Sequence, residues 1–347
     1  MYTSRTATSR RIVVVGAGVV GASVAHHLVR AGHEVVVLDS GYPAGGVTGA
    51  SFAWVGLAKS SADVHTEPLR ARAMAEFDRV VTEISAPIGL RRCGAITWEE
   101  DDSATNRFVA AHQDAGHRME HLSGPELSVR EPALVQVPST AAFAPDDLGV
   151  DPVAYTRSLL QSAQQSGAVF RAPTQVIALL TDDDRVRGVL TDHGEITAES
   201  VVLAAGTGST RLAQMAGVHV DVAASPCCLL TFSTPRPLVR SILSTPDFEV
   251  RQLDDNTLLA AEDVPLGFSG DPAEIASTTL EALQSHLYGA NELRLKQAVI
   301  ADRPMPTGGR PLVGPAPGVP GLYLAVAHPA VILSAAIGSQ VASDHTL

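Results

Sequence analysis

The sequence predicts an α/β fold, α+β overall, in which a domain built on a parallel sheet carries an inserted domain built on an antiparallel sheet. Continuous β-branched and apolar runs are typical of strands buried on both faces, and they occur within residues 12–38, 201–205 and 322–326. Residues 218–262 instead alternate as an antiparallel sheet does. Because the alternating stretches separate the buried runs, we expect a discontinuous first domain and an insertion in two pieces.

The length of the chain, 347 residues, fits about two domains of roughly 150 residues each. We expect the first domain to comprise residues 1–56, 150–212 and 300–347, and the inserted domain to comprise residues 57–149 and 213–299.

Composition excludes several classes of protein. Apolar residues make up 45% and charged residues 18% of the chain, which excludes intrinsic disorder. A net charge of −12 without a Lys/Arg run argues against nucleic acid or an anionic membrane as a partner. Cys93, Cys227 and Cys228 are too few for a disulfide framework, and we interpret the adjacent pair as buried thiols. No CxxC or HExxH spacing occurs, so the sequence predicts no metal site.

The N-terminal region imitates a secretion signal. Arg10 and Arg11 precede an apolar stretch, but glycines interrupt that stretch, and the residues after it fit a strand and a helix of one fold. The longest candidate for a membrane span, residues 322–337, contains His328 and Pro329. We therefore expect a cytoplasmic protein.

The first forty residues form a βαβ pattern. A buried strand at 12–15 leads into a glycine turn, a helical pattern at 20–31 ends at Gly32, and a second buried strand at 34–38 ends at Asp39. Two such strands joined by a helix predict a parallel sheet of the Rossmann type.

The rest of the chain predicts further helices and strands. Helices are expected at residues 69–84, 106–117, 125–130, 153–167, 272–288 and 331–342. Strands are expected at residues 91–98, 169–180, 185–191, 201–205 and 322–326, with a further hairpin arm from Gly194. Residues 143–151 are expected to form an irregular link, and residues 304–321 a segment rich in Pro and Gly.

The glycine turn has the spacing of a phosphate-binding motif. In Gly16-Ala-Gly18-Val19-Val20-Gly21, Gly16 permits a tight turn and Gly18 leaves room for a pyrophosphate. Gly21 lets the helix approach the sheet, and the helix N-terminus, with Val19 and Val20, presents N–H groups and a positive dipole end. A dinucleotide is therefore the expected ligand.

An acidic residue completes this motif. Asp39 follows Gly21 by eighteen positions and is expected, with Ser40 beside it, to contact a ribose. A carboxylate accepts hydrogen bonds from ribose hydroxyls and repels a 2′-phosphate. This unit alone leaves NAD and FAD as alternatives.

Four further motifs carry a resemblance to a known family. They are Asp39, the loop Gly46-Val-Thr48-Gly-Ala-Ser51, the strand Val201-Val-Leu-Ala-Ala-Gly206, and Arg303-Pro-Met-Pro-Thr-Gly-Gly-Arg-Pro-Leu-Val-Gly314. With the glycine turn, their order and spacing resemble the D-amino-acid oxidase family of FAD oxidoreductases, which includes glycine oxidase and sarcosine oxidase. The resemblance covers nearly the whole chain and is weakest at residues 213–300. It implies a Rossmann-type FAD-binding domain with an inserted antiparallel-sheet substrate domain.

The resemblance also implies roles for single positions. Thr48 and Ser51 would contact the second phosphate and ribityl chain, Val176 would bind adenine through its backbone, and Ala205 and Gly206 would lie close to the cofactor. Ala53 and Trp54 would line the approach to the flavin ring, although Trp54 fits a core residue equally well. The positions that align with a covalent flavin tether carry neither His nor Cys. FAD is therefore expected to bind noncovalently.

The substrate side has four candidate residues. Three are the charged residues Arg303, Arg251 and Lys59, and the fourth is His328 of the C-terminal motif. Family members that act on amino acids place an arginine at the position of Arg303, and its guanidinium would bind a carboxylate in bidentate fashion. The alternative is an arginine paired with a structural acid such as Asp302 or Glu262. Arg251 is a second candidate, unless it is a solvated strand arginine. Lys59 would activate dioxygen or orient substrate, unless it is an ordinary surface lysine.

The C-terminal motif departs from the family pattern. The family has His, a small residue and Gly before a helix, whereas this chain has His328-Pro329-Ala330-Val331-Ile332. Backbone N–H groups at Ala330, Val331 and Ile332, with the helix dipole, would stabilise negative charge on the reduced flavin. Because Pro329 has no N–H, we expect an unusual flavin environment and a less conventional substrate or acceptor than glycine with dioxygen.

The function expected from the resemblance is FAD-dependent oxidation of the C–N bond of an amino acid or secondary amine to an imine, by hydride transfer to flavin N5. Dioxygen or another acceptor would reoxidise the flavin. Two alternatives stay open: a flavoprotein subunit or scaffold without turnover of its own, and an NAD-dependent dehydrogenase. The sequence does not decide whether the chain forms a homo-oligomer.

Overall fold

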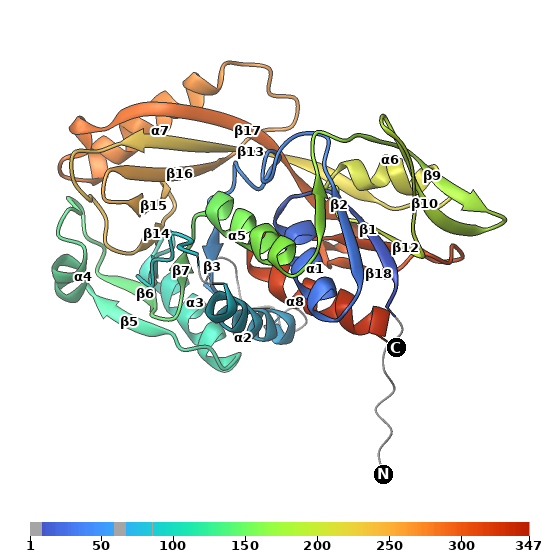
Figure 1. Cartoon of the computed structure of the whole chain (residues 1–347). Coiled ribbons are helices and arrows are strands. Elements are labelled where there is room, and N and C mark those ends of the chain that lie inside the picture. Colours follow the sequence, from blue (N-terminus) through green and yellow to red (C-terminus); the bar gives the residue numbers. More distant parts are fainter. Residues whose placement is uncertain (1–8, 59–66, 85, 347) are drawn as a thin grey trace, which may run out of the picture.

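Two large sheets organise the protein, whose computed structural model describes residues 9–58, 67–84 and 86–346. One sheet has six mostly parallel strands and the other has eight mostly antiparallel strands. Figure 1 shows the two sheets in different parts of the molecule, with helices α1, α5 and α8 packed against the six-stranded sheet. The predicted combination of a parallel and an antiparallel sheet is confirmed.

The six-stranded sheet has the order β18-β19-β12-β1-β2-β8. Its strands are β1 (Arg11–Val15), β2 (Glu34–Leu38), β8 (Val169–Arg171), β12 (Ser200–Leu203), β18 (Leu312–Pro315) and β19 (Leu322–Val326). All neighbours run parallel except β18, which is antiparallel to β19. The central strands are buried on both faces, which is why they read as continuous apolar runs.

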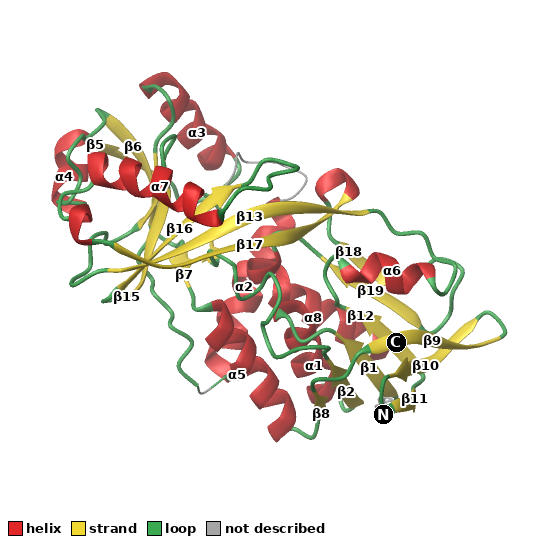
Figure 2. Ribbon diagram, turned by 90° about the horizontal axis from the view of Figure 1, so that it is seen from above, coloured by secondary structure: helices red, strands yellow, loops and turns green. Residues whose placement is uncertain are grey.

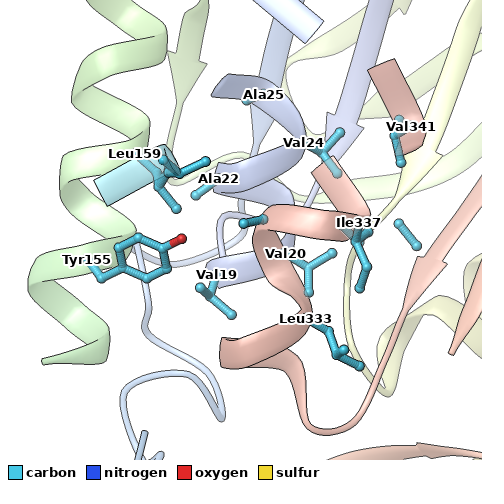
Figure 3. Close-up of a cluster of buried hydrophobic side chains, with 14 of the residues drawn as sticks. Val19, Val20, Ala22, Val24, Ala25, Tyr155, Leu159, Leu333, Ile337 and Val341 are labelled. Atoms are coloured by element: carbon cyan, nitrogen blue, oxygen red, sulfur yellow. The ribbon is translucent and has the colours of Figure 1, made fainter. Parts of the chain in front are cut away.

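Helices α1 (Val19–Arg30), α2 (Glu67–Glu83), α5 (Pro152–Gln165) and α8 (Ala330–Thr346) pack beside this sheet. Figure 3 shows apolar side chains of α1, α5 and α8 converging, among them Val24, Leu159 and Ile337. A Cβ at Gly338 of α8 would clash with Ser23 and His27 of α1, so the absence of a side chain permits close helix contact.

The alignment of α1 and α8 determines where their ends lie. Ser23 Oγ donates a hydrogen bond to the Ser334 carbonyl (2.8 Å), and Gly338 lies against His27, four residues further along α1. The two helices therefore run in the same direction. Their N-termini, at Val19 and Ala330, lie at the same end of the pair and both reach one cavity.

The eight-stranded sheet has the order β17-β13-β16-β15-β14-β4-β6-β5. Its strands are β4 (Ala95–Thr97), β5 (Glu120–Ser123), β6 (Thr140–Ala144), β13 (Val222–Ser233), β14 (Ile242–Ser244), β15 (Glu249–Asp254), β16 (Thr257–Asp263) and β17 (Arg294–Pro306). The expected antiparallel pattern is confirmed for β13, β15 and β16, whereas β14 pairs parallel with β4. Three helices contact strands of this sheet: α3 (Asp102–Asp114), α4 (Gly124–Arg130) and α7 (Pro272–His286).

Smaller elements complete the fold. A three-stranded sheet contains β9 (Val176–Asp182), β10 (Arg185–Thr191) and β11 (Gly194–Thr197), and β3 (Trp54–Val55) pairs with β7 (Leu148–Gly149). The last elements are helix α6 (Gly208–Gln214) and the 3₁₀ turns η1 (Ala290–Glu292) and η2 (Thr307–Gly309).

The long strands β13 and β17 connect the two parts of the molecule. They pair in an antiparallel register from Val222 opposite Pro306 to Ser233 opposite Arg294. Figures 1 and 2 show them side by side, running from the part that holds α7 toward the part that holds α6. The expected domain boundary at residue 300 falls inside β17, and the domain division stays a prediction.

Several local expectations differ from the structure. The strand expected at 91–98 is reduced to Ala95–Thr97, and the irregular link at 143–151 contains the end of β6 and all of β7. Helix α6 and most of β17 were not expected. β17 lacks a simple apolar alternation because much of its surface is exposed or half-buried, so sequence pattern alone does not distinguish it.

Candidate functional site

A cavity of about 520 Å³ lies where the six-stranded sheet's helices meet the long strands of the other sheet. Its walls come from the loop after β2, from β13, β15, β16 and β17, and from the start of α8. The lining residues that bear on its chemistry are Val19, Thr48, Ser51, Ala53, Trp54, Cys227, Cys228, Asp247, Glu249, Glu262, Asp263, Arg303, His328, Ala330 and Val331. Segments distant in the sequence therefore form one site.

The glycine turn after β1 has no room for a side chain at its first and third glycines. A Cβ at Gly16 would clash with the Ala204 carbonyl, and Gly16 has φ +109°, which favours glycine. A Cβ at Gly21 would clash with the carbonyl of Gly16 itself. The first and third glycines thus fit the turn against β12 and the start of α1, as the motif predicts.

The N-terminus of α1 opens at this turn. Gly18 is the N-cap and makes no side-chain capping bond, and the Val19 N–H donates to Thr48 Oγ1 (3.2 Å). Val20 and Gly21 continue the first helical turn, and Val19 and Thr48 line the cavity. A glycine N-cap and the positive end of a helix beside a cavity are the features that hold a phosphate.

Asp39 shapes the turn from the end of β2. Its Oδ2 accepts from the Ala17 N–H (2.7 Å) and its Oδ1 accepts from the Gly41 N–H (2.8 Å). A carboxylate has about four acceptor positions. The expected contact of Asp39 with a ribose is therefore compatible with these bonds and stays a prediction, as does the contact of the exposed Ser40 beside it.

The loop from Thr48 to Trp54 forms one wall of the cavity. Ser51 Oγ accepts from the Ala53 N–H (3.1 Å), and Ala53 has φ +54°, a conformation that L-residues seldom adopt. Ser51, Ala53 and Trp54 all line the cavity, so the resemblance placed these residues beside one site. Trp54 is both a core residue and a wall residue, because it is buried and also lines the cavity.

Asp147 holds this wall in place. It is buried, and its carboxylate accepts from Trp54 Nε1 (2.8 Å) and from the N–H groups of Leu57 (3.0 Å) and Ala58 (3.2 Å). Burial raises the pKa of Asp147 to about 6, although the three hydrogen bonds oppose the rise. Sequence reasoning missed Asp147 because nothing near it in sequence indicates a partner 93 residues away.

Of the other expected cofactor contacts, only those at the start of α8 line the cavity. Ala330 and Val331 line it at the start of α8, and Ile332 is buried behind them. After β12, the Ala205 N–H donates to Ser209 Oγ (3.1 Å) and Gly206 has φ +57°. Val176 lies at the start of β9, paired with Thr191, and does not line the cavity. The adenine contact expected of Val176 stays a prediction.

Arg303 lies on the part of the cavity wall that β17 forms. It belongs to β17, and its Nη2 forms an ion pair with Asp263 Oδ1 (2.7 Å) and a hydrogen bond to Ser225 Oγ (2.9 Å). Arg303 and His328 both line the cavity, as expected of substrate-facing residues. The partner acid is Asp263, whereas the sequence had suggested Asp302 or Glu262.

Arg251 corrects an expectation. Only 1% of it is exposed, and its Nε and Nη2 donate to the carbonyls of Phe52 (2.5 Å) and Val150 (2.8 Å). Burial lowers its pKa to about 10. Arg251 is absent from the cavity lining and is not solvated either, so it is a structural cation behind the wall rather than a second carboxylate clamp. Lys59 lies outside the described residues.

The two adjacent cysteines also reach the cavity. Cys228 is buried and Cys227 is half-buried, with its Sγ donating to the Ala301 carbonyl (3.4 Å). Burial raises the pKa of both thiols. Both thiols are therefore uncharged at neutral pH. Cys228 is a buried thiol, as interpreted from the sequence, whereas Cys227 is half-buried.

Comparison with known proteins decides the family. A family model described as FAD dependent oxidoreductase (DAO) matches residues 11–343. The chain belongs to this family. The resemblance stated from the motifs is confirmed, and FAD is the cofactor rather than NAD.

The relatives agree with this assignment. The chain is 27% identical to a glycine oxidase of Pseudomonas aeruginosa over 332 residues, covering 92% of this chain and 90% of the relative. It is 30% identical to a D-amino acid dehydrogenase of Paramagnetospirillum magneticum over 274 residues, covering 61% of this chain and 64% of the relative. The structure of glycine oxidase from Bacillus cereus superposes with a TM-score of 0.88 at 23% identity, covering 97% of this chain and 95% of that chain.

The residues of this oxidoreductase fit an FAD cofactor. A tight glycine turn with no side chain at Gly18, and the N-termini of α1 and α8 at one cavity, provide for a diphosphate. An apolar wall of Ala53 and Trp54 provides for a flat ring.

Within the part of the chain that the structure describes, no helix is long and apolar enough to cross a membrane. The same residues form no group of three or more His, Cys, Asp or Glu side chains placed to hold a metal ion.

Proposed function

We propose that this enzyme oxidises the C–N bond of a small amine or amino acid to an imine. The observation that carries the proposal is the cavity that joins the start of α1, the start of α8 and the substrate-facing wall of β17. Relatives named glycine oxidase and D-amino acid dehydrogenase support this reaction class. The carbon beside the nitrogen loses a hydride and the nitrogen loses a proton, so the bond between them becomes double.

FAD, when bound noncovalently, supplies the two-electron acceptor for that hydride. Gly16, Gly18 and the N–H groups at the start of α1 would hold its diphosphate, and Asp39 would hold a ribose. The N-terminal turn of α8, beginning at Ala330, directs a positive dipole end at the cavity. That end would stabilise negative charge as the cofactor becomes reduced.

The chain's own part in the reaction is to position the substrate and exclude water. Trp54, held by Asp147, and Ala53 form an apolar wall, and Arg303 supplies a cation to the same cavity. A neutral amine can release its Cα hydrogen as hydride without a protein base. The site therefore needs orientation and desolvation more than a catalytic acid or base.

The oxidant and the cellular location belong to the same proposal. Dioxygen, reduced to peroxide, or another carrier would take the two electrons from the reduced enzyme. The residues that imitate a secretion signal form β1 and α1 in the core of the fold. Their place in the core supports a cytoplasmic enzyme.

Anaerobic reduction of the purified yellow holoprotein tests the reaction. D- and L-amino acids, N-methyl amino acids, cyclic imino acids and simple secondary amines are added one at a time, and the flavin absorbance is followed. At least one amine class should bleach the flavin, and the matching alcohol should leave it unchanged. Full reduction by dithionite with no reduction by any amine would instead support the flavoprotein scaffold without turnover.

A further inference from the structure

Three neighbouring strands bring the carboxylate of Asp263 into contact with the guanidinium of Arg303. Arg303 lies on β17, Ser225 lies opposite it on β13, and Asp263 ends β16 on the other side of β13. The Arg303 side chain reaches across β13, and its Nη2 meets both Ser225 Oγ and Asp263 Oδ1. This arrangement follows from sheet register and brings together residues 40 positions apart in sequence.

This contact changes what Arg303 can offer a substrate. A bidentate clamp on a carboxylate uses two N–H groups of one guanidinium edge. Here one of the terminal nitrogens already contacts Asp263, and its charge is balanced at 2.7 Å. A substrate carboxylate must therefore displace Asp263, or share the guanidinium with it at the cost of repulsion between like charges.

Asp263 can act in this way because it lies at the rim. Its side chain is 84% exposed, whereas that of Arg303 is 26% exposed. The carboxylate can move into solvent at little cost, so it opposes a substrate carboxylate without blocking the cavity. A substrate that brings an ammonium group gains from the same carboxylate.

The formal charge of the cavity lining also opposes a substrate carboxylate and favours an ammonium group. Asp247, Glu249, Glu262 and Asp263 line the cavity, and Arg303 is the only Lys or Arg among the lining residues that the structure describes. Glu262 accepts from Thr279 Oγ1 (2.9 Å), a contact that positions the side chain.

We infer that Asp263 is a specificity-determining residue that turns this enzyme away from α-carboxylate substrates and toward amines with a neutral or cationic substituent on the reacting carbon. The inference rests on the proposed amine oxidation and names its substrate class. Asp263 acts through Arg303 and the local field, and it takes no part in the oxidation itself.

A charge series of three secondary amines tests the inference. Sarcosine, N-methylethanolamine and N-methylethylenediamine share an N-methylaminomethyl group and differ in whether the adjacent substituent is anionic, neutral or cationic. With the wild-type holoenzyme, the second-order rate constant for anaerobic flavin reduction should be lowest for sarcosine. In Asp263→Asn, the ratio of sarcosine to diamine should rise by about tenfold, since both arms respond to one lost charge.

Asp302→Asn is the matched control. Asp302 precedes Arg303 on β17, is exposed and does not line the cavity, so this variant removes the same charge without altering the ion pair. Its substrate ratio should stay within about twofold of wild type, as screened surface charges predict. Equal ratios in Asp263→Asn and wild type, or equal shifts in both variants, would overturn the inference.

Binding of acetate provides a readout independent of turnover. The dissociation constant of acetate, from the perturbation of the flavin spectrum, should fall about threefold to fivefold in Asp263→Asn. The gain should disappear when Arg303→Met is added, because the competition acts through the guanidinium. If acetate binding responds in this way but no amine or amino acid of the whole panel reduces the flavin, the proposed function fails while Asp263 keeps its role toward carboxylates. If the amines react but acetate affinity and the substrate ratio do not change, only the inference fails.

Discussion

The two sides of the cavity are built in different ways. On the cofactor side, a glycine turn and two helix N-termini present backbone groups, and the residues within each of these segments follow one another in sequence. On the substrate side, single side chains meet across β13, β16 and β17. Backbone sites tolerate few substitutions because they depend on chain geometry, whereas side-chain pairs can change and redirect specificity.

The largest expected effect is on the cofactor side. Gly21→Val would drive a side chain into the Gly16 carbonyl, so the turn and α1 could not both keep their positions. We expect FAD binding to be lost and the unfolding free energy to fall by about 3 kcal/mol or more. Thermal unfolding and FAD titration measure both quantities.

Gly18→Ala is the control for that change. Its Cβ would lie 3.2 Å from Thr48 Oγ1 and meets no backbone atom, so the fold should survive. FAD affinity alone should weaken. If Gly21→Val bound FAD as wild type does, the backbone account of the cofactor side would be wrong.

The next effect separates the two arginines. Arg251→Met removes a buried guanidinium and leaves the carbonyls of Phe52 and Val150 without their donors. We expect a loss of about 2–4 kcal/mol of stability, measured by chemical denaturation. Arg303→Met, at the partly exposed ion pair, should change stability by less than about 1 kcal/mol. A reversed order would contradict the structural role assigned to Arg251.

Asp147 gives a pH dependence with a definite sign. Its pKa is about 6 in the folded protein and 3.8 ordinarily, so the folded state binds the proton more tightly. The stability due to this group is therefore fully present below about pH 4 and is lost as pH rises through about 6, by roughly 2–3 kcal/mol. Denaturation between pH 4 and 8 should show wild type losing stability relative to Asp147→Asn across that window. A difference independent of pH would contradict the assignment.

The smallest effect is on substrate affinity. Arg303→Ala should raise KM for a carboxylate amine by about tenfold, because Asp263 already offsets part of the charge that the substrate would meet. KM for N-methylethanolamine should change little. Equal KM changes for both substrates would remove Arg303 from the carboxylate contact.

The contrast between the two sides explains how much the sequence could predict. The glycine turn, β1 and β2 follow one another in sequence and depend on local backbone geometry, so they were predicted closely. The contacts of Asp263 with Arg303 and of Asp147 with Trp54 depend on sheet register and chain closure. No local pattern encodes them. Arg251 was misassigned for the same reason, because burial of a strand arginine is decided by the elements packed over it.

The most direct measurement is the flavin spectrum of the purified holoprotein before and after anaerobic addition of N-methylethanolamine, followed by admission of air. We expect an oxidised flavin spectrum at the start, full bleaching with one equivalent of imine or its aldehyde formed per flavin, and return of colour with the oxidant. A protein that takes up no flavin, or a flavin that keeps its colour with every amine while dithionite bleaches it, would contradict the account.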